Sequence, residues 1–358
     1  MQRNFILTDV MKTGAHQTYE QFLDTHSLPD QIIKHTGEYY TLHNYNLDSY
    51  DRKFAMIDRT ISNHSRLLNN TEYQQELTRR VKLLHSQGFK FILATPWESY
   101  ENTITGNVYP KEIGIKSFEW TGGTSWFWFY MYHKHLNNKF KFTHDHFGSY
   151  FYKKYDFLYL NKQPREHRVR LYNKMLSENI LSNSVYTFLG LKSPVRLSKE
   201  HELPWVDANN YPKYGMDQDI YEPSYNDTVY SLVSETNDND TDVFMTEKIW
   251  KPIIAQQVFV VHGNHLYLQK LREIGFKTFG SYFDESYDLE SNRDKKIDAI
   301  VNLCKDRKHR DWKDLYLQTI ALRQHNYDTF FNKEKLSAEV NKVLVSFLEF
   351  FDNSQISS

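Results

Sequence analysis

The densest set of side-chain types suited to bind an anionic ligand lies between residues 234 and 263. Thr246 stands where a predicted helix begins, and Glu247 and Lys248 occupy its first turn. A helix start offers free backbone N–H groups and a partial positive charge, which suit a phosphate. Lys248 adds a point charge for the phosphate, and Glu247 can accept hydrogen bonds from ribose hydroxyls. The same residues also fit an ordinary capped helix start facing solvent, so their spacing alone leaves both interpretations open.

The elements that position these residues follow the order of a parallel α/β protein. Short apolar runs alternate with segments in which apolar residues recur at helical spacing. The predicted strands cover 4–8, 89–95, 155–160, 184–188, 228–233 and 258–261, and the predicted helices cover 76–87, 169–179 and 247–257. In such a sheet, ligands bind beyond the carboxyl ends of the strands. The polar segments that follow the strands are therefore the expected ligand-binding edge.

Two α/β domains are the simplest account of this order. We place the first at residues 1–150, the second at 151–335 and a C-terminal helix at 336–358. The tail from residue 292 onward has apolar residues at helical spacing, so it is expected to be helical. The most apolar stretch, residues 126–132, is far shorter than the roughly 20 residues that a membrane-spanning helix needs, so it is interpreted as core or as a site wall.

Three short segments together resemble the signature of the α1,3-fucosyltransferase family. That signature reads Phe-Glu-Asn, then Tyr-Val-Thr-Glu-Lys, then Pro-Val-aliphatic-aromatic-Gly. The counterparts in this chain are Ser234-Glu235-Thr236, Phe244-Met245-Thr246-Glu247-Lys248 and Phe259-Val260-Val261-His262-Gly263. The segment 161–173 resembles the stretch that these enzymes place after the first strand of the donor-binding domain. The resemblance covers residues 150 to 280, and its motifs stand in the family's order.

The resemblance implies an inverting GT-B glycosyltransferase, with two Rossmann-like domains facing a cleft. The N-terminal domain would bind the acceptor, and the C-terminal domain would bind a nucleotide sugar, with GDP-fucose as the donor. By resemblance, Arg168 pairs with the diphosphate, Glu247 holds the ribose and Lys248 meets a phosphate. Thr246 stands at the donor site with them, and Glu235 lies near the sugar or the donor loop. A guanidinium suits the role of Arg168 because it binds phosphate oxygens in bidentate fashion.

The resemblance also implies a catalytic base. Inverting transfer needs a carboxylate that takes the proton of the acceptor hydroxyl. Family members carry a Glu-Ser pair just past a strand of the N-terminal domain, and Glu98-Ser99 stands at the corresponding point here. Glu98 is therefore the predicted base. Glu101 could do the same work, and a loop carboxylate without a role is the remaining interpretation.

No cofactor and no metal are expected. Asp238-Asn239-Asp240 and Asp240-Thr241-Asp242 match the Asp-x-Asp pattern of metal-dependent transferases. They lie in the polar loop before the Thr-Glu-Lys segment, where the family carries no metal motif, so we interpret them as a solvated loop. The His-x-His pairs at 133–135 and 144–146 have no third ligand nearby at a zinc spacing.

Composition limits the partners and the compartment. The chain has 44 Lys and Arg against 45 Asp and Glu, a net charge of −1, so nucleic acid is a possible partner but not an implied one. A single cysteine, Cys304, excludes an internal disulfide, and the N-terminus lacks the apolar segment of a secretory signal. A cytoplasmic protein without a membrane span is expected.

Two alternatives to a transferase acting on glycans stay open. One is a GT-B transferase that glycosylates a modified nucleic-acid base, which a local patch of Lys139, Lys141, Lys153 and Lys154 would favour. The other is a carbohydrate-binding protein without catalytic activity, which would explain the 57 aromatic residues (26 Tyr, 24 Phe and 7 Trp).

Overall fold

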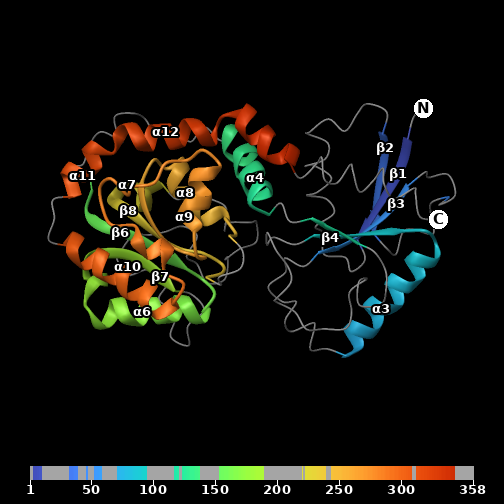
Figure 1. The fold of residues 1–358 in the computed structure, drawn as a ribbon, viewed down its shortest axis with the longest axis horizontal. Helices are drawn as coiled ribbons and strands as arrows, with labels where there is room; N and C mark the ends of the chain where they lie inside the picture. The colour runs from blue at the N-terminus through green and yellow to red at the C-terminus, as the bar shows by residue number, and fades with distance from the viewer. Residues whose placement is uncertain are drawn as a thin grey trace. The chain divides into compact units, whose positions relative to one another are not determined.

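The computed structural model of the chain is a mixed α/β protein, which confirms the predicted class. Residues 1–126 and 337–358 form one compact unit, and residues 127–336 form a second. Each unit contains a parallel sheet (Figure 1). The structure describes residues 3–9, 32–38, 46, 52–58, 71–94, 117–120, 123–137, 153–188, 220, 222–238, 243–308 and 312–342.

The first unit contains a sheet in the strand order β2-β1-β3-β4-β5. Its strands are β1 (Arg3–Asp9), β2 (Ile32–Glu38), β3 (Arg52–Asp58), β4 (Lys90–Ala94) and β5 (Ser117–Trp120). Helix α3 (Thr71–Ser86) buries Leu77, Val81 and Leu84. Gly88 follows the helix at φ +80°, a left-handed conformation that glycine adopts without strain. The predicted succession of helix, glycine and strand is confirmed.

The second unit contains a sheet in the order β7-β6-β8-β9. Its strands are β6 (Tyr155–Asn161), β7 (Ser184–Phe188), β8 (Thr228–Ser234) and β9 (Val258–His262). Every residue of β8 and β9 is buried, as expected for strands covered on both faces. The four strands predicted here are confirmed to within one residue at each end.

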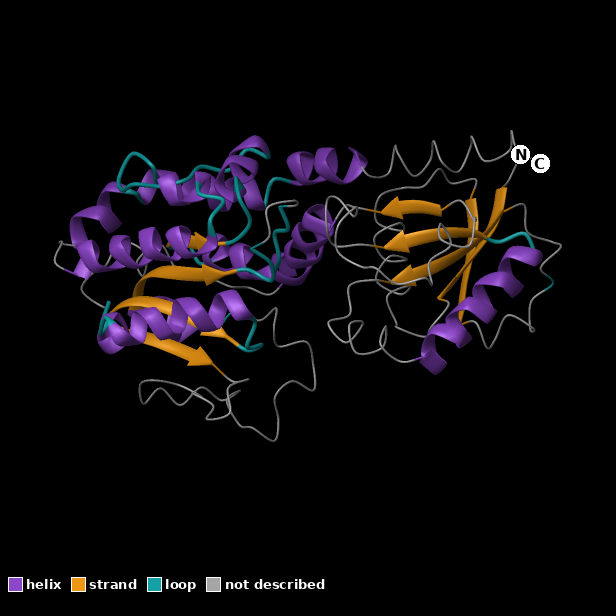
Figure 2. Ribbon diagram, turned by 60° about the horizontal axis from the view of Figure 1, so that its bottom comes forward, coloured by secondary structure: helices purple, strands orange, loops and turns teal. Residues whose placement is uncertain are grey.

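Helices cover both faces of the second sheet. Figures 1 and 2 show α6 with α10 on one face, and α8 with α12 on the other. The helices are α6 (Glu166–Ser177), α7 (Glu222–Asp227), α8 (Glu247–Ile254), α9 (Tyr267–Glu273), α10 (Arg293–Lys308), α11 (Trp312–Gln318) and α12 (Ile320–Phe330), with 3₁₀ turns η5 (Ile180–Asn183) and η7 (Ser286–Leu289). Residues 333–342 are also helical. Within the ranges above, no helix combines the length and apolar character that crossing a membrane requires.

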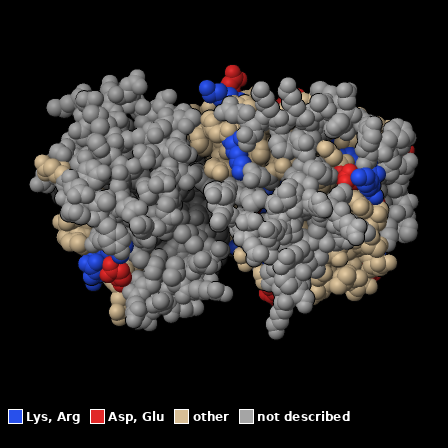
Figure 3. Space-filling view, turned by 180° about the vertical axis from the view of Figure 1, so that it is seen from behind, with Lys and Arg blue, Asp and Glu red and all other residues tan. Residues whose placement is uncertain are grey.

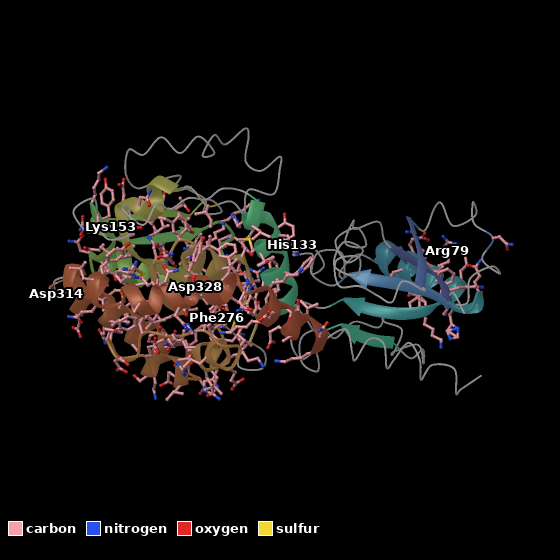
Figure 4. The ribbon with its side chains drawn as sticks, turned by 90° about the horizontal axis from the view of Figure 1, so that it is seen from above. Arg79, His133, Lys153, Phe276, Asp314 and Asp328 are labelled. Carbon is pink, nitrogen blue, oxygen red and sulfur yellow. The ribbon has the colours of Figure 1, made fainter. Side chains whose placement is uncertain are left out.

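Helix α4 (Gly123–Asn137) joins the second unit from residue 127 onward. Trp128 is fully buried there: its ring stacks on Trp250 with centroids 5.6 Å apart and meets Phe276 at 5.1 Å. Its indole Nε1 donates to the Phe330 carbonyl at 2.9 Å. Figure 4 labels Phe276 among the side chains that fill this unit. The sequence placed the domain boundary at residue 150, whereas this aromatic packing puts the unit boundary between residues 126 and 127.

Candidate functional site

The candidate site lies at the carboxyl edge of the second sheet. The strand β8 ends at Ser234 and is followed by Glu235, and the neighbouring strand β9 ends at His262. Helix α8 and helix α6 both begin at this edge, because in a parallel sheet each crossover helix starts just after the carboxyl end of a strand. Segments that are far apart in the sequence therefore meet here.

Glu235 lies at the centre of this edge, and its carboxylate is fully buried. Oε1 accepts hydrogen bonds from the Thr246 backbone N–H at 3.1 Å and from the Tyr267 hydroxyl at 2.8 Å. Oε2 accepts from the Thr246 hydroxyl at 2.6 Å and from the Thr236 N–H at 3.2 Å. The sequence assigned Glu235 to donor binding near the sugar or the donor loop. In the structure this carboxylate is closed to solvent and accepts four hydrogen bonds from protein donors.

Thr246 is the N-cap of α8, as the sequence predicts. Its backbone is extended, at φ −109° and ψ −174°, and its Oγ1 accepts a hydrogen bond from the Lys248 N–H at 3.4 Å. The same hydroxyl donates to Glu235. The Thr246 hydroxyl is thus bound both to Glu235 and to the first turn of the helix, and these two contacts set the direction in which α8 begins.

Glu247 and Lys248 keep part of their side chains in contact with solvent, 13% and 24% exposed respectively. The Lys248 ammonium donates to Glu247 Oε1 at 2.7 Å, to Thr246 Oγ1 at 3.0 Å and to Thr236 Oγ1 at 3.2 Å. Burial pushes the pKa of Glu247 upward, but Lys248 and Lys251 together hold it below its usual value. A ligand at this edge therefore meets a carboxylate that accepts hydrogen bonds beside a cation.

Arg168, on the first turns of α6, belongs to the same network but is almost fully buried. Its Nε and Nη2 donate to the Glu235 carbonyl at 3.1 and 2.8 Å. Burial lowers the pKa of Arg168 to about 10, which leaves the guanidinium charged at neutral pH. The structure thus brings Arg168, Glu235, Thr246 and Lys248 together, with Arg168 held by a backbone carbonyl.

His167 packs beside Arg168 and is neutral at pH 7, because burial lowers its pKa to about 4. Its Nε2 lies 3.0 Å from the Glu235 carbonyl, a contact that assigns the proton to Nε2. Its ring meets the ring of His262 edge to face, with centroids 5.4 Å apart. Burial likewise holds the pKa of His262 well below its usual value. The edge therefore contains two buried neutral imidazoles.

Sequence reasoning missed a row of buried polar side chains formed by Asn161, Ser234 and His262. Ser234 and His262 are partners in the β8–β9 register, and continuing the β6–β8 register by three residues places Asn161 beside Ser234. Among the described residues, the side chains of Asn161 and Ser234 interact with the buried Tyr159 hydroxyl, whereas both His262 nitrogens lack a hydrogen-bond partner. Buried groups of this kind call for an explanation in ordered water or ligand. The sequence feature that could have indicated this row is that each of the three is the polar residue at the carboxyl end of an apolar strand.

The close approach of the Tyr267 ring explains why the motif after β9 ends in glycine, at Gly263. A Cβ atom at this position would lie 2.8 Å from the ring of Tyr267, closer than real side chains approach. Tyr267 is itself buried, and its hydroxyl donates to Glu235. The missing side chain therefore lets Tyr267 reach the central carboxylate.

Other predicted residues fall outside the part of the chain that the structure describes, namely Glu98, Glu101, Asp240 and Asp242. Asp238 is described, and its carboxylate pairs with Arg293. Among the described side chains, no group of three or more His, Cys, Asp and Glu is placed to hold a metal ion. The absence of a metal requirement stays a prediction.

The lysine patch proposed for nucleic acid is weakened at its two described positions. Lys154 pairs with Asp227 at 3.3 Å, and the Lys153 ammonium donates to the Tyr225 carbonyl at 3.1 Å. Burial lowers the pKa of Lys153 to about 7, so it is only partly charged at neutral pH. On the face drawn in Figure 3, most of the coloured Lys and Arg side chains lie beside Asp or Glu.

Comparison of the chain with protein-family models, with curated proteins and with solved structures finds no match. The likeness to α1,3-fucosyltransferases therefore rests on the sequence segments quoted above.

We predict that Glu235→Gln destabilises the second unit. The new amide nitrogen donates rather than accepts, so at least one of the donors from Thr246, Tyr267 and Thr236 loses its partner. The free energy of unfolding should fall by on the order of 3 kcal/mol, measured by urea denaturation. As a control, Glu273→Gln at an exposed position of α9, where the carboxylate accepts from Gln269 at 3.2 Å, should change it by less than about 0.5 kcal/mol. Equal stability of Glu235→Gln and wild type would contradict the role given to this carboxylate.

Acid should destabilise the second unit through its buried imidazoles. The unfolded chain binds protons on His167 and His262 with a pKa near 6.5, whereas the folded pKa of His167 is about 4. The stability contributed by the neutral rings is therefore complete above pH 6.5 and is lost as the pH falls toward 4. The loss from His167 is about 3 kcal/mol.

The measurement is urea unfolding across this pH range, with His262→Leu compared with wild type. This variant should lose less stability on acidification, because one buried base is gone. A matched change at half-exposed His265, which lies in the same unit, should leave the pH dependence as in wild type. Identical slopes for His262→Leu and wild type would count against the assignment.

Proposed function

We propose that this chain is an inverting glycosyltransferase with a nucleotide-sugar site at the carboxyl edge of the second sheet. One observation carries the proposal: Arg168, Glu235, Thr246 and Lys248, selected from separate motifs, form one hydrogen-bonded network there. The resemblance gives the donor as GDP-fucose and the acceptor as a hydroxyl of a glycan. A parallel sheet in each unit supports a GT-B arrangement of two Rossmann-like domains.

The chemistry of the edge suits a nucleoside diphosphate. The start of α8 presents a partial positive charge, and Lys248 stands beside it with part of its side chain in solvent. Lys248 meets a phosphate, and the Glu247 carboxylate accepts from the ribose hydroxyls. Glu98 of the first unit takes the proton of the acceptor hydroxyl as the diphosphate leaves, and no step requires a metal.

The test is a screen of nucleotide sugars for hydrolysis and transfer in excess EDTA, together with thermal shifts in GDP, UDP and guanosine. A nucleotide-sugar enzyme should be stabilised by a nucleoside diphosphate and should release it from the sugar. Stabilisation by free sugars but by no nucleotide would favour the carbohydrate-binding alternative. Activity that is lost in EDTA and restored by Mn²⁺ or Mg²⁺ would overturn the metal-independent mechanism.

We predict that Lys248→Ala weakens binding of the nucleoside diphosphate by about 2 kcal/mol, or roughly 30-fold, because it removes one charge-assisted contact. Isothermal titration calorimetry measures this loss directly. Lys270→Ala on α9, whose ammonium pairs with Glu273 at 3.8 Å, is the control and should bind as wild type does. Arg168→Ala should also weaken binding, but it removes two buried hydrogen bonds as well, so Lys248 is the cleaner position. Unchanged affinity in Lys248→Ala would remove the central claim.

Glu98→Gln should affect the chemical step and leave donor binding intact. Glutamine keeps the shape and the hydrogen bonding of the side chain but does not accept the proton. We expect kcat to fall by roughly 10²-fold or more while the Kd for the nucleoside diphosphate stays the same. If this variant turns over at the wild-type rate, the base is Glu101 or another carboxylate of the first unit.

A further inference from the structure

The four residues 235–238, which follow β8, accept hydrogen bonds from four cationic side chains of the candidate site: Arg165, Arg168, Lys248 and Arg293. Arg168 donates to the Glu235 carbonyl, and Lys248 donates to Thr236 Oγ1. Arg165 Nη1 donates to the Thr236 carbonyl at 2.9 Å and lies 3.4 Å from Asn237 Oδ1. The 235–238 segment thus supplies oxygen acceptors to cationic side chains that could equally bind the oxygens of an anion.

Asp238, the last residue of this segment, supplies a carboxylate. Arg293, at the start of α10, donates two parallel hydrogen bonds to this carboxylate: Nε to Oδ2 at 2.5 Å and Nη2 to Oδ1 at 3.0 Å. The Nδ1 atom of His167 lies 3.5 Å from the same carboxylate. The Asp238 side chain is only 6% exposed, whereas that of Arg293 is 38% exposed. Two parallel bonds from one guanidinium are also the geometry in which Arg holds a phosphate group.

We infer that Arg165 and Arg293 are further ligands for the anionic group of the substrate. Asp238 takes the place of that anion on Arg293, and the Thr236 carbonyl and Asn237 Oδ1 take its place on Arg165. The ligand class is a phosphate or diphosphate dianion. A phosphate that arrives from solvent meets Arg293 and Lys248, replaces the Asp238 carboxylate on Arg293, and thereby frees the 235–238 segment from α10. The identity of the complete ligand rests on the proposed function, whereas the existence of the anion site does not.

The reason for the exchange is charge and geometry. A phosphate carries more charge than a carboxylate and has three oxygens to share between guanidinium groups, so it gains more from Arg293 than Asp238 does. Arg168 is almost wholly buried beneath the Glu235 carbonyl, so an anion reaches it only when the segment shifts. Displacement of Asp238 gives the segment that freedom.

The chain offers a control in a second ion pair made by α10, this one with α6. Arg170 on α6 pairs with Asp294 on α10 at 2.8 Å, and both side chains are exposed. This outward pair resembles the Arg293–Asp238 pair in residue types but contacts none of residues 235–238 in the hydrogen bonds found for it. Arg170 and Arg293 both contact the Glu166 carboxylate, at 2.6 and 3.4 Å, so Asp294→Asn, which leaves both of these contacts in place, is the cleaner control. Changes to it test whether loss of any ion pair near α10 produces the expected effect.

The experiment is calorimetric titration of the full chain with inorganic pyrophosphate at neutral pH. Asp238→Asn should bind pyrophosphate at least about fivefold more tightly than wild type, because the competing carboxylate is gone. Arg293→Gln should bind it about tenfold more weakly. Asp294→Asn and Arg170→Gln should bind it as wild type does.

An unchanged or weaker affinity in folded Asp238→Asn overturns the inference. If that variant does not fold, Arg293→Gln against Asp294→Asn decides, and equal affinities for these two overturn it. Parallel titrations with GDP separate this inference from the proposed function. If pyrophosphate behaves as described but GDP binds no more tightly than pyrophosphate, the anion site stands and the nucleotide site fails. If GDP binds well but neither Asp238→Asn nor Arg293→Gln alters either titration, the nucleotide site stands and the role of Asp238 and Arg293 fails.

Discussion

The buried carboxylate of Glu235 is the constraint on which the carboxyl edge of the second sheet depends. A charge removed from water is tolerated only where hydrogen-bond donors replace the water. Here the donors come from the residue after it, from the cap of α8 and from α9. Those elements must stand where their donors reach the carboxylate, so a single residue determines where α8 begins.

The backbone carbonyl of the same residue orders a fourth element. His167 and Arg168 of α6 both approach the Glu235 carbonyl, while the N–H of Glu235 donates to the His262 carbonyl at 2.9 Å. The strand ends and the helix starts of this edge are therefore joined through one residue. This explains how cations come to lie close together in a chain with a net charge of −1: carbonyl and carboxylate oxygens separate them.

Local sequence signals predicted the elements, and long-range contacts decided what those signals could not. The strands of the second sheet, the glycine after α3 and the cap at Thr246 depend on neighbours in the chain, so they could be read from the sequence. The membership of α4 in the second unit depends on Trp128 meeting Trp250, which lies 122 residues later (250 − 128 = 122). The burial of Glu235 depends in the same way on Tyr267 and Gly263, and its motif position alone suggested a ligand-facing side chain.

Helix α8 is held by polar contacts at its start and by aromatic packing in its body. Its start is fixed by Thr246 and Glu235 at a polar edge, and its body is fixed by Trp250, which packs on Trp128 and Phe330. A functional side chain keeps its geometry best when it stands on an element that packing already immobilises. Lys248 lies between the cap and the aromatic core, so neither the tilt nor the register of its helix can shift without breaking one of them. The aromatic contacts that α4 makes with Trp250 thus help to fix the position of Lys248.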